Sequence, residues 1–384
     1  MKKIICTLVI FTLIFNWVSV FSKDISNLES GSIIMMDQAT GKVLYEKNAD
    51  FKCEIASVTK IMTALLLMEE IDKGNIKYTD MITTSEYAES MGGSQLFLKV
   101  GEQMSVDDML KGLMINSGND AAVAIAEHVS GSEEAFVERM NVRAKELGMN
   151  NTMFRNSNGL PEDNQYSTAR DVALMSRELM KNHPDIKKYT TIWMDSLRGG
   201  ELLLSNTNKL MSPAPTIGYQ GATGLKTGYT DSALHCLSAT AERDKVGLVT
   251  VILGAQNSDL RFDEAKILFD YGFKNFTFKE MINKGDVIKT IPVIKGNKET
   301  VNAVAKNDCA IFDIKNVKGE FTTEIDIAES IKAPFEKGHK LGVMRVKKGD
   351  TVMGEVELVS DSKVNKRNLL HILKLYFEYW LGIK

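Results

Sequence analysis

Residues 53–71 of the chain are CEIASVTKIMTALLLMEEI. No charged residue occurs from Ile61 to Met68, so this stretch predicts a helix that is buried on nearly every side. Lys60 stands in the first turn, where the helix dipole favours acidic residues. The spacing is not a capping box either, because that motif needs Glu or Gln three residues after the capping Ser. Local stability therefore does not explain Lys60.

The spacing of Ser57 and Lys60 suits a chemical role. Helix positions three apart are neighbours on one face, so the Lys60 amine can reach the Ser57 hydroxyl. Burial lowers the pKa of a lysine, and a neutral amine beside a serine can accept the hydroxyl proton during nucleophilic attack. The same S-x-x-K spacing recurs at Ser360 and Lys363, in a polar stretch predicted to lie at the surface. The spacing alone is therefore weak evidence.

Two further motifs occur later in the chain. The sequence SGN at residues 117–119 opens a predicted helix rich in small residues, and an alternative interpretation makes Ser117 simply its N-cap. The sequence KTG at residues 226–228 predicts a strand whose glycine permits close approach of a ligand. The surrounding GATGLKT resembles a phosphate-binding loop, but the P-loop pattern fails because a Leu separates the glycine from the lysine.

The composition limits the class of protein. The chain has 384 residues, 44% of them hydrophobic, which is enough for two or three domains with sizeable cores. A net charge of −3 argues against a nucleic-acid-binding protein. No His or Cys stands in a metal-ligand spacing, and no G-x-S-x-G motif occurs, so a Ser-His-Asp hydrolase is disfavoured. Cys53, Cys236 and Cys309 are expected to be small buried apolar residues.

The N-terminus, MKKIICTLVIFTLIFNWVSVFSKD, predicts export. Two lysines precede an apolar run that ends in small residues, as in a secretory signal peptide over residues 1–22. A retained membrane anchor is the alternative, because the apolar run is long for a signal peptide.

The remaining pattern predicts an α/β (α+β) catalytic domain at residues 23–274. A β-hairpin at 32–46 and two strands around a turn at 242–245 lie at the two ends of this domain, with helices at 57–73, 106–115, 120–129, 134–147 and 169–181 between them. One sheet built from both ends, with a helical insert, is the natural arrangement. A further helix is predicted at 263–271.

Two smaller parts follow the catalytic domain. Short alternating stretches separated by Gly turns predict a small all-β domain, of β-sandwich type, at residues 275–364. The tail at 365–384 predicts an amphipathic helix with clustered aromatic residues, too short to span a bilayer and suited to lie in the membrane interface. The alternative is a terminal helix docked on the protein's own core.

Taken together and in this order, the motifs resemble the penicillin-recognising serine acyl-transferases. The stretches IASVTKIMTALL, INSGNDAA, NSNGLPEDNQYSTARDVALM and GLKTGYT are most similar to low-molecular-mass penicillin-binding proteins, the D-alanyl-D-alanine carboxypeptidases. The order of leader, catalytic domain, β domain and tail is also similar to that family. The middle motif is S-G-N and not S-D-N, which disfavours class A β-lactamases. Glu162, in the segment that carries their deacylating glutamate, is expected to be an exposed loop acid.

The resemblance implies a role for each motif residue. Ser57 would be the acylated nucleophile, Lys60 its base, and Ser117 a proton relay toward the leaving amine, kept polarised by Lys226. Asn119 would orient the substrate amide. Thr227 would hold the terminal carboxylate of the substrate, with Arg261 as a helper. The backbone N–H groups of Ser57 and Tyr229 would form the oxyanion hole, and Gly228 belongs to the same substrate-binding segment.

The implied reaction releases the terminal D-alanine of peptidoglycan stem peptides that end in D-Ala-D-Ala, on the outer face of the cytoplasmic membrane. Penicillin would mimic that dipeptide and trap Ser57, and neither a metal nor an organic cofactor is implied. Two alternatives remain open at this point. One is a β-lactamase or transpeptidase on the same scaffold, and the other is a catalytically silent protein that binds the cell wall.

Overall fold

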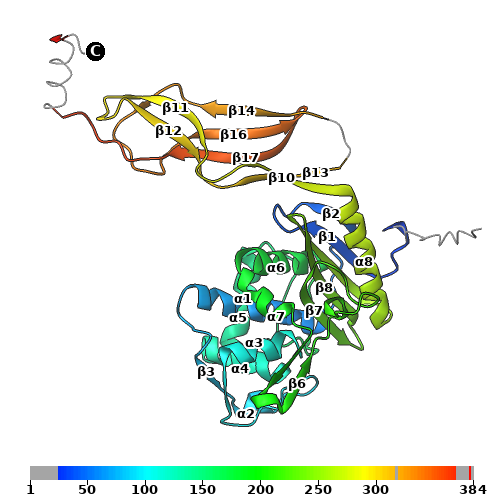
Figure 1. Cartoon of the computed structure of the whole chain (residues 1–384). Coiled ribbons are helices and arrows are strands. Elements are labelled where there is room, and N and C mark those ends of the chain that lie inside the picture. The colour runs from blue at the N-terminus through cyan, green and yellow to red at the C-terminus, as the bar shows by residue number, and fades with distance from the viewer. Residues whose placement is uncertain (1–24, 316–318, 369–379, 382–384) are drawn as a thin grey trace, which may run out of the picture.

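The computed structural model describes residues 25–315, 319–368 and 380–381, apart from the side chain of residue 278. The predicted signal peptide at 1–22 and most of the predicted tail helix at 365–384 lie outside the described residues. A mixed helix-and-sheet part extends from the first described residue through helix α8, Ser258–Asn275, and an all-β part follows it (Figure 1).

The first part is built on a five-stranded antiparallel sheet. Its strand order is β2-β1-β9-β8-β7. The bounds are β1, Ser32–Asp37; β2, Val43–Lys47; β7, Ala222–Thr230; β8, Leu234–Arg243; and β9, Val246–Ala255. The predicted sheet from both ends of the domain is confirmed. All six residues of β1 are buried because both faces of the sheet are covered.

Helices cover one face of this sheet and fill the insert. They are α1, Lys60–Asp72; α3, Val106–Met114; α4, Asn119–Ser130; α5, Glu133–Glu146; and α6, Ala169–Asn182. Thr168 caps α6, because its Oγ1 accepts a hydrogen bond from the Asp171 N–H at 3.1 Å. Helix α6 packs on β9 and β1, so Ile34 and Met36 belong to the same core as the helices.

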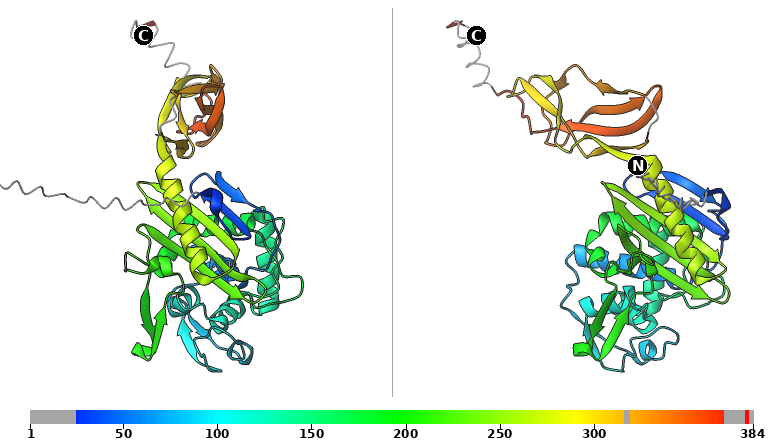
Figure 2. Two further views of the ribbon diagram at one scale, coloured as in Figure 1. Left: turned by 90° about the vertical axis from the view of Figure 1, so that its right-hand side faces the viewer. Right: turned by 45° about the vertical axis from the view of Figure 1, so that its right-hand side comes forward.

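Helix α8 covers the opposite face, as Figure 2 shows, and packs on β9 and β8. Ile33 and Met35, which alternate with the residues of the helical core, form a second core with Phe262 and Phe269 of α8. The helix is longer than the 263–271 predicted, because the Asn257 side chain caps it at a more N-terminal position, accepting from the N–H groups of Asp259 and Leu260.

Shorter elements connect the helices. They are β3, Met81–Thr83; α2, Glu86–Glu89; β4, Gln103–Ser105; α7, Lys187–Thr190; β5, Met194–Leu197; and β6, Leu202–Ser205. Five 3₁₀ segments complete the part: η1, Ile25–Asn27; η2, Ala56–Thr59; η3, Pro184–Ile186; η4, Arg198–Gly200; and η5, Lys209–Met211. Segment η2 runs directly into α1 and carries Ser57.

The second part is all-β, as predicted. Strands β10, Phe276–Ile282, and β13, Cys309–Ile314, pair with each other. The other six strands form one sheet in the order β14-β16-β17-β12-β11-β15. Their bounds are β11, Val287–Ile294; β12, Thr300–Ala305; β14, Phe321–Ile327; β15, Ile331–Lys332; β16, Lys340–Lys348; and β17, Thr351–Ser360. A separate apolar core, which includes Ile291, Val346 and Leu358, lies inside this part.

The structure corrects the expectation that the second S-x-x-K segment lies at the surface. Ser360 ends β17 and is buried, and its Oγ donates to the Glu336 carbonyl at 2.8 Å and accepts from the His339 N–H at 3.1 Å. Lys363 is exposed and forms an ion pair with Glu336 at 2.6 Å. Within the three described ranges, no helix combines the length and the apolar content that crossing a membrane requires.

Candidate active site

The turn that carries Ser57 is held between two glycine-containing segments. A Cβ on Gly228 of β7 would lie 2.7 Å from the Ile55 carbonyl oxygen and 3.1 Å from the Ser57 backbone nitrogen. A Cβ on Gly159 would lie 2.0 Å from the Ala56 carbonyl oxygen. The distances of 2.7 and 2.0 Å to the two carbonyl oxygens are shorter than real Cβ contacts, so only glycine allows β7 and the 156–160 loop to approach η2 this closely.

Lys60 lies at the centre of the site and is fully buried. Its Nζ lies 3.0 Å from Ser57 Oγ, 2.6 Å from Asn119 Oδ1 and 2.6 Å from the Asn158 carbonyl oxygen. Burial holds the pKa of Lys60 well below that of an ordinary lysine; the charge on Lys226 lowers it further, and Asp120 opposes both. The contact with Ser57 therefore joins a hydroxyl to an amine whose neutral form is favoured.

The SGN motif does not begin its helix in the way that the N-cap interpretation of Ser117 requires. Helix α4 begins at Asn119 with Gly118 as its N-cap residue, and Ser117 is buried with a positive φ of 66°. The Asn119 side chain is bonded at both ends: Oδ1 accepts from Lys60, and Nδ2 donates to the Gly92 carbonyl at 2.7 Å. Asn119 thereby joins α4 to the base and to the loop at residues 90–98.

Strand β7 contributes the KTG motif from the opposite side. Lys226 is buried, and burial, with a smaller effect of the Arg261 charge, lowers its pKa to about 7. Its Nζ donates to the Thr227 carbonyl at 3.2 Å. The Thr227 hydroxyl donates to Thr207 Oγ1 at 2.7 Å. Because the charge of Lys226 lowers the pKa of Lys60, the first and third motifs lie close enough to interact electrostatically.

Tyr229 and Arg261 occupy different positions. Tyr229 is 55% exposed, and its hydroxyl donates to Asp231 Oδ1 at 2.9 Å. Arg261 of α8 is buried, and its Nη1 donates to the carbonyls of Gly228 and Cys236 at 2.8 and 2.9 Å. The Arg261 guanidinium thus joins β7 to β8, and its Nε is buried without a hydrogen-bond partner among the described residues.

Sequence reasoning missed two residues of this site. Asn158 supplies a backbone carbonyl to Lys60, and buried Asp120 accepts hydrogen bonds from the backbone N–H groups of Leu96 and Leu98 at 2.9–3.2 Å. Asp120 thereby fixes the loop that Asn119 also contacts. The only sequence signal was position, since Asp120 directly follows the SGN motif and Asn158 lies in the quoted NSNGL stretch.

Glu162 is exposed, as expected. The three described cysteines are free thiols; Cys236 and Cys309 are buried as expected, whereas Cys53 is only half-buried. Burial raises the pKa of Cys53 to about 12 and that of Cys236 to about 11, so both thiols stay protonated and unreactive near neutral pH.

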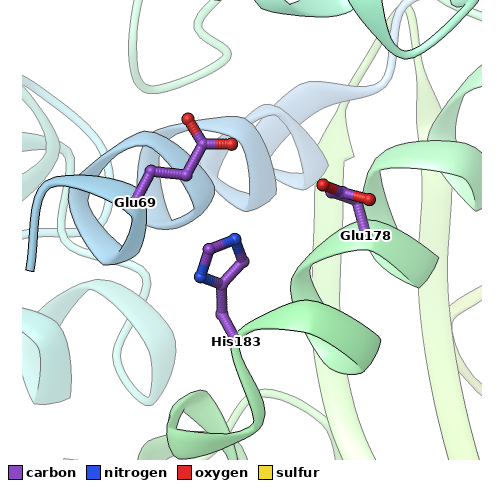
Figure 3. A group of neighbouring side chains, drawn as sticks. All are labelled: Glu69, Glu178 and His183. Atoms are coloured by element: carbon purple, nitrogen blue, oxygen red, sulfur yellow. The ribbon is translucent and has the colours of Figure 1, made fainter. Parts of the chain in front are cut away.

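A second polar cluster lies near the C-terminal end of α1. Glu69, Glu178 and His183 point toward one another, with ligand-type atoms within 4.8 Å (Figure 3). Arg143 neutralises both carboxylates, because its Nε bonds Glu69 at 2.6 Å and its Nη2 bonds Glu178 at 2.7 Å. His183 Nδ1 lies 2.6 Å from Asp72. The arrangement is an ion-pair network that joins α1, α5 and α6.

Comparison with known proteins identifies the family of the chain. Residues 19–257 match the D-alanyl-D-alanine carboxypeptidase family, and residues 276–366 match the C-terminal domain of penicillin-binding protein 5. The D-alanyl-D-alanine carboxypeptidase DacF of Bacillus subtilis is 38% identical over the full length of both chains. The DacC carboxypeptidase of Escherichia coli is 36% identical over 83% of this chain and 80% of its own.

Solved structures show the same relationship. Penicillin-binding protein 5 of Haemophilus influenzae superposes with a TM-score of 0.77 at 30% identity, covering 88% of this chain and 98% of its own. Ampicillin-bound penicillin-binding protein D2 of Listeria monocytogenes covers 64% of this chain and 98% of its own, with a TM-score of 0.58 and 31% identity. The chain therefore belongs to the D-alanyl-D-alanine carboxypeptidase family, serine peptidases of the penicillin-binding type that act in peptidoglycan metabolism.

Proposed function

We propose that the chain releases the terminal D-alanine from peptidoglycan stem peptides through an acyl-enzyme on Ser57. The observation that carries the assignment is the 3.0 Å contact between Ser57 Oγ and the Nζ of Lys60, which is fully buried. In the first step neutral Lys60 accepts the Ser57 proton while Oγ attacks the carbonyl carbon of the penultimate D-alanine.

The oxyanion of the tetrahedral intermediate would be stabilised by the backbone N–H groups of Ser57 and Tyr229. A Cβ added to Gly228 would lie 3.1 Å from the Ser57 nitrogen, so this part of β7 lies close to the Ser57 N–H. Tyr229 directly follows Gly228, which supports the pairing of the two N–H groups. Donors of this kind contribute roughly 3–4 kcal/mol each to the transition state. Substitution of Gly228 would therefore disturb nucleophile and oxyanion site together.

Collapse of the intermediate breaks the C–N bond and needs a proton on the leaving amine. We assign that transfer to Ser117, which receives the proton from the Lys60 ammonium. Charged Lys226 and the Thr227 hydroxyl would bind the terminal carboxylate of the substrate. Water then attacks the acyl carbonyl carbon while neutral Lys60 accepts its proton. The new tetrahedral intermediate breaks its bond to Ser57 Oγ, which takes that proton back from Lys60 as the shortened peptide leaves.

Asn119 and Arg261 contribute in different ways. One Nδ2 hydrogen of Asn119 donates to the Gly92 carbonyl and Oδ1 accepts from Lys60, so the side chain is held in place and its second Nδ2 hydrogen can donate to a substrate amide carbonyl. Arg261 bonds two backbone carbonyls and would act on the carboxylate site through the position of β7 and the charge it places near Lys226.

The decisive experiment combines product and adduct analysis. Purified protein incubated with a pentapeptide ending in D-Ala-D-Ala should release D-alanine, and mass spectrometry after penicillin treatment should locate one adduct on Ser57. Ser57→Ala should abolish both signals, and Ser360→Ala, the matched control, should keep both. An active Ser57→Ala enzyme would refute the assignment. Rapid penicillin turnover would indicate a β-lactamase. A cross-linked product formed with an amine acceptor would indicate a transpeptidase, and the absence of any adduct would indicate a silent binding protein.

We also propose that the enzyme acts on the outer face of the cytoplasmic membrane, after export by the leader, and attaches through the tail at residues 365–384. The amphipathic pattern of that tail supports the proposal. Membrane fractionation of the full chain and of a chain ending at Asn368 tests it. The shorter chain should lose most of its membrane-bound fraction, and equal fractions would refute attachment through the tail.

A further inference from the structure

A cavity of about 810 Å³ opens at one end of the all-β part. Its lining includes four basic residues, Lys295, Lys332, Lys366 and Arg367. We call these four residues the basic end surface. Its apolar lining comes from the end of β11 and from the residue after β15, where Val293 and Ala333 are buried and Ile294 is 48% exposed.

Backbone hydrogen bonds hold the three contributing segments together. Strand β15 pairs in parallel with the end of β11, and the Ala333 N–H donates to the Ile294 carbonyl at 3.0 Å. The Arg367 N–H donates to the Lys295 carbonyl at 3.0 Å, and Arg367 Nε donates to the Gly296 carbonyl at 2.7 Å. The fold therefore holds the backbone positions of the four basic residues next to one another.

The four charges are not balanced locally. Across the part of the chain that the structure describes, no carboxylate forms an ion pair with any of them. Other lysines of the same domain are paired: Lys306 with Glu357 at 2.9 Å, and Lys363 with Glu336 at 2.6 Å. Like charges gathered without counter-ions repel one another, so an anionic partner would be bound favourably here.

The location suggests which anion. The basic end surface lies where the chain leaves the β domain after Arg367, at the end remote from α8 (Figures 1 and 2). A rim of cations around an exposed apolar side chain matches the boundary between phosphate headgroups and acyl chains of a bilayer. Lysine or arginine near an anionic lipid surface strengthens binding roughly fivefold per residue.

We propose that the basic end surface binds anionic phospholipid headgroups, so that the β domain itself touches the membrane. The inference rests on the proposed membrane-facing location of the enzyme but adds a second contact besides the tail. Lys295 and Lys332 lie outside the tail, and a contact made by three backbone-linked segments would fix the orientation of the β domain on the bilayer, which a single terminal helix cannot do.

The test uses the full chain with Lys295→Gln and Lys332→Gln combined, compared with Lys42→Gln and Lys77→Gln combined. The control removes two exposed lysines of the catalytic domain that form no ion pair among the described residues. With vesicles containing phosphatidylglycerol, the first pair should weaken binding at least tenfold, from roughly fivefold per residue. The control pair should change it less than twofold, and binding of both proteins to phosphatidylcholine vesicles should be equal to that of the parent chain.

Four outcomes would overturn the proposal. Three concern vesicle binding: no loss with the first pair, an equal loss with the control pair, or an equal loss on phosphatidylcholine. The fourth is tighter lysine-dependent binding to soluble poly(glycerol phosphate) than to vesicles, which would favour a wall polymer. Unchanged thermal unfolding and unchanged D-alanine release from a soluble pentapeptide show that the variants are folded. Failure of the proposed catalysis or of tail attachment would appear separately, in D-alanine release and in the chain ending at Asn368.

Discussion

The chain contains two S-x-x-K segments, and the structure places them in opposite settings. At the first, Lys60 is buried in a helix and its Nζ contacts Ser57 Oγ at 3.0 Å. At the second, the serine is buried at the end of a strand, and Lys363 is exposed and paired with Glu336. Burial of the lysine, and not of the serine, therefore separates a candidate base from a structural residue.

The largest effect is expected from removal of the proposed base. Lys60→Met should slow formation of the penicillin adduct about a thousandfold or more, because general-base catalysis contributes roughly 10²- to 10⁴-fold and Met supplies no proton acceptor. Lys363→Met should stay within about twofold of the parent rate. The rate is measured by quenching the reaction at successive times and determining the adduct by mass spectrometry, with thermal unfolding as the folding control. A Lys60→Met enzyme that acylates at the parent rate would remove the distinction between the segments.

Next in size is the effect of widening the space around the nucleophile. Gly228→Ala would place a Cβ 2.7 Å from the Ile55 carbonyl oxygen, so β7 must move away from η2. A displacement near 1 Å costs about a hundredfold in rate. Gly31→Ala is the matched control, because its Cβ would come no closer than 3.6 Å to other atoms. Adduct formation measures both variants, and equal rates would show that the close approach is not needed.

The pH profile of acylation provides a third test. Lys60 must be neutral to accept a proton, so activity is lost as the pH falls through its pKa, which burial lowers. Lys226 must be charged, so activity is lost as the pH rises through its pKa of about 7. The second-order rate constant should therefore be bell-shaped, with slopes up to about tenfold per pH unit. A single limb that rises until pH 10.5 would contradict both shifts.

How far the sequence predicts this site depends on whether the signal is local. The charge-free run after Lys60 indicates burial, and burial supplies the chemistry. Ser117 was ambiguous, because a serine before a helix resembles an N-cap until the backbone shows a φ of 66° and Gly118 as the cap. Asn158 could not be found this way, since it acts through a backbone carbonyl that every residue possesses, 98 positions from Lys60.

The β domain shows the same limit. Alternating polar and apolar stretches indicate strands, but the order β14-β16-β17-β12-β11-β15 depends on pairings between distant segments that no local pattern specifies. Ser360 was misplaced for that reason. Its stretch is polar, yet the strand that ends there turns the hydroxyl toward two backbone groups of residues 336–339.

A smaller effect is expected at Asp120, which the sequence did not indicate. Asp120→Asn replaces a carboxylate oxygen by an NH₂ group that cannot accept from the N–H groups of Leu96 and Leu98, and should lower the free energy of unfolding by about 2 kcal/mol. Because the Asp120 charge raises the pKa of Lys60, the acid limb of the pH profile should move to lower pH. Chemical denaturation and the acylation profile measure the two effects, and an acid limb that moves upward would contradict this electrostatic role.

The smallest effect on activity is expected at the second segment itself. Ser360→Ala removes one hydrogen bond donated to Glu336 and one accepted from His339, so the β domain should lose about 1–2 kcal/mol of stability. The apolar core around β17 is separate from the helical core that holds Lys60, so acylation of Ser57 should change less than about twofold. Thermal unfolding and the rate of adduct formation, measured on separate portions of one preparation, give both quantities. A loss of acylation that exceeds the loss of folded protein would show that the two S-x-x-K segments are coupled, and that the β domain supports catalysis as well as location.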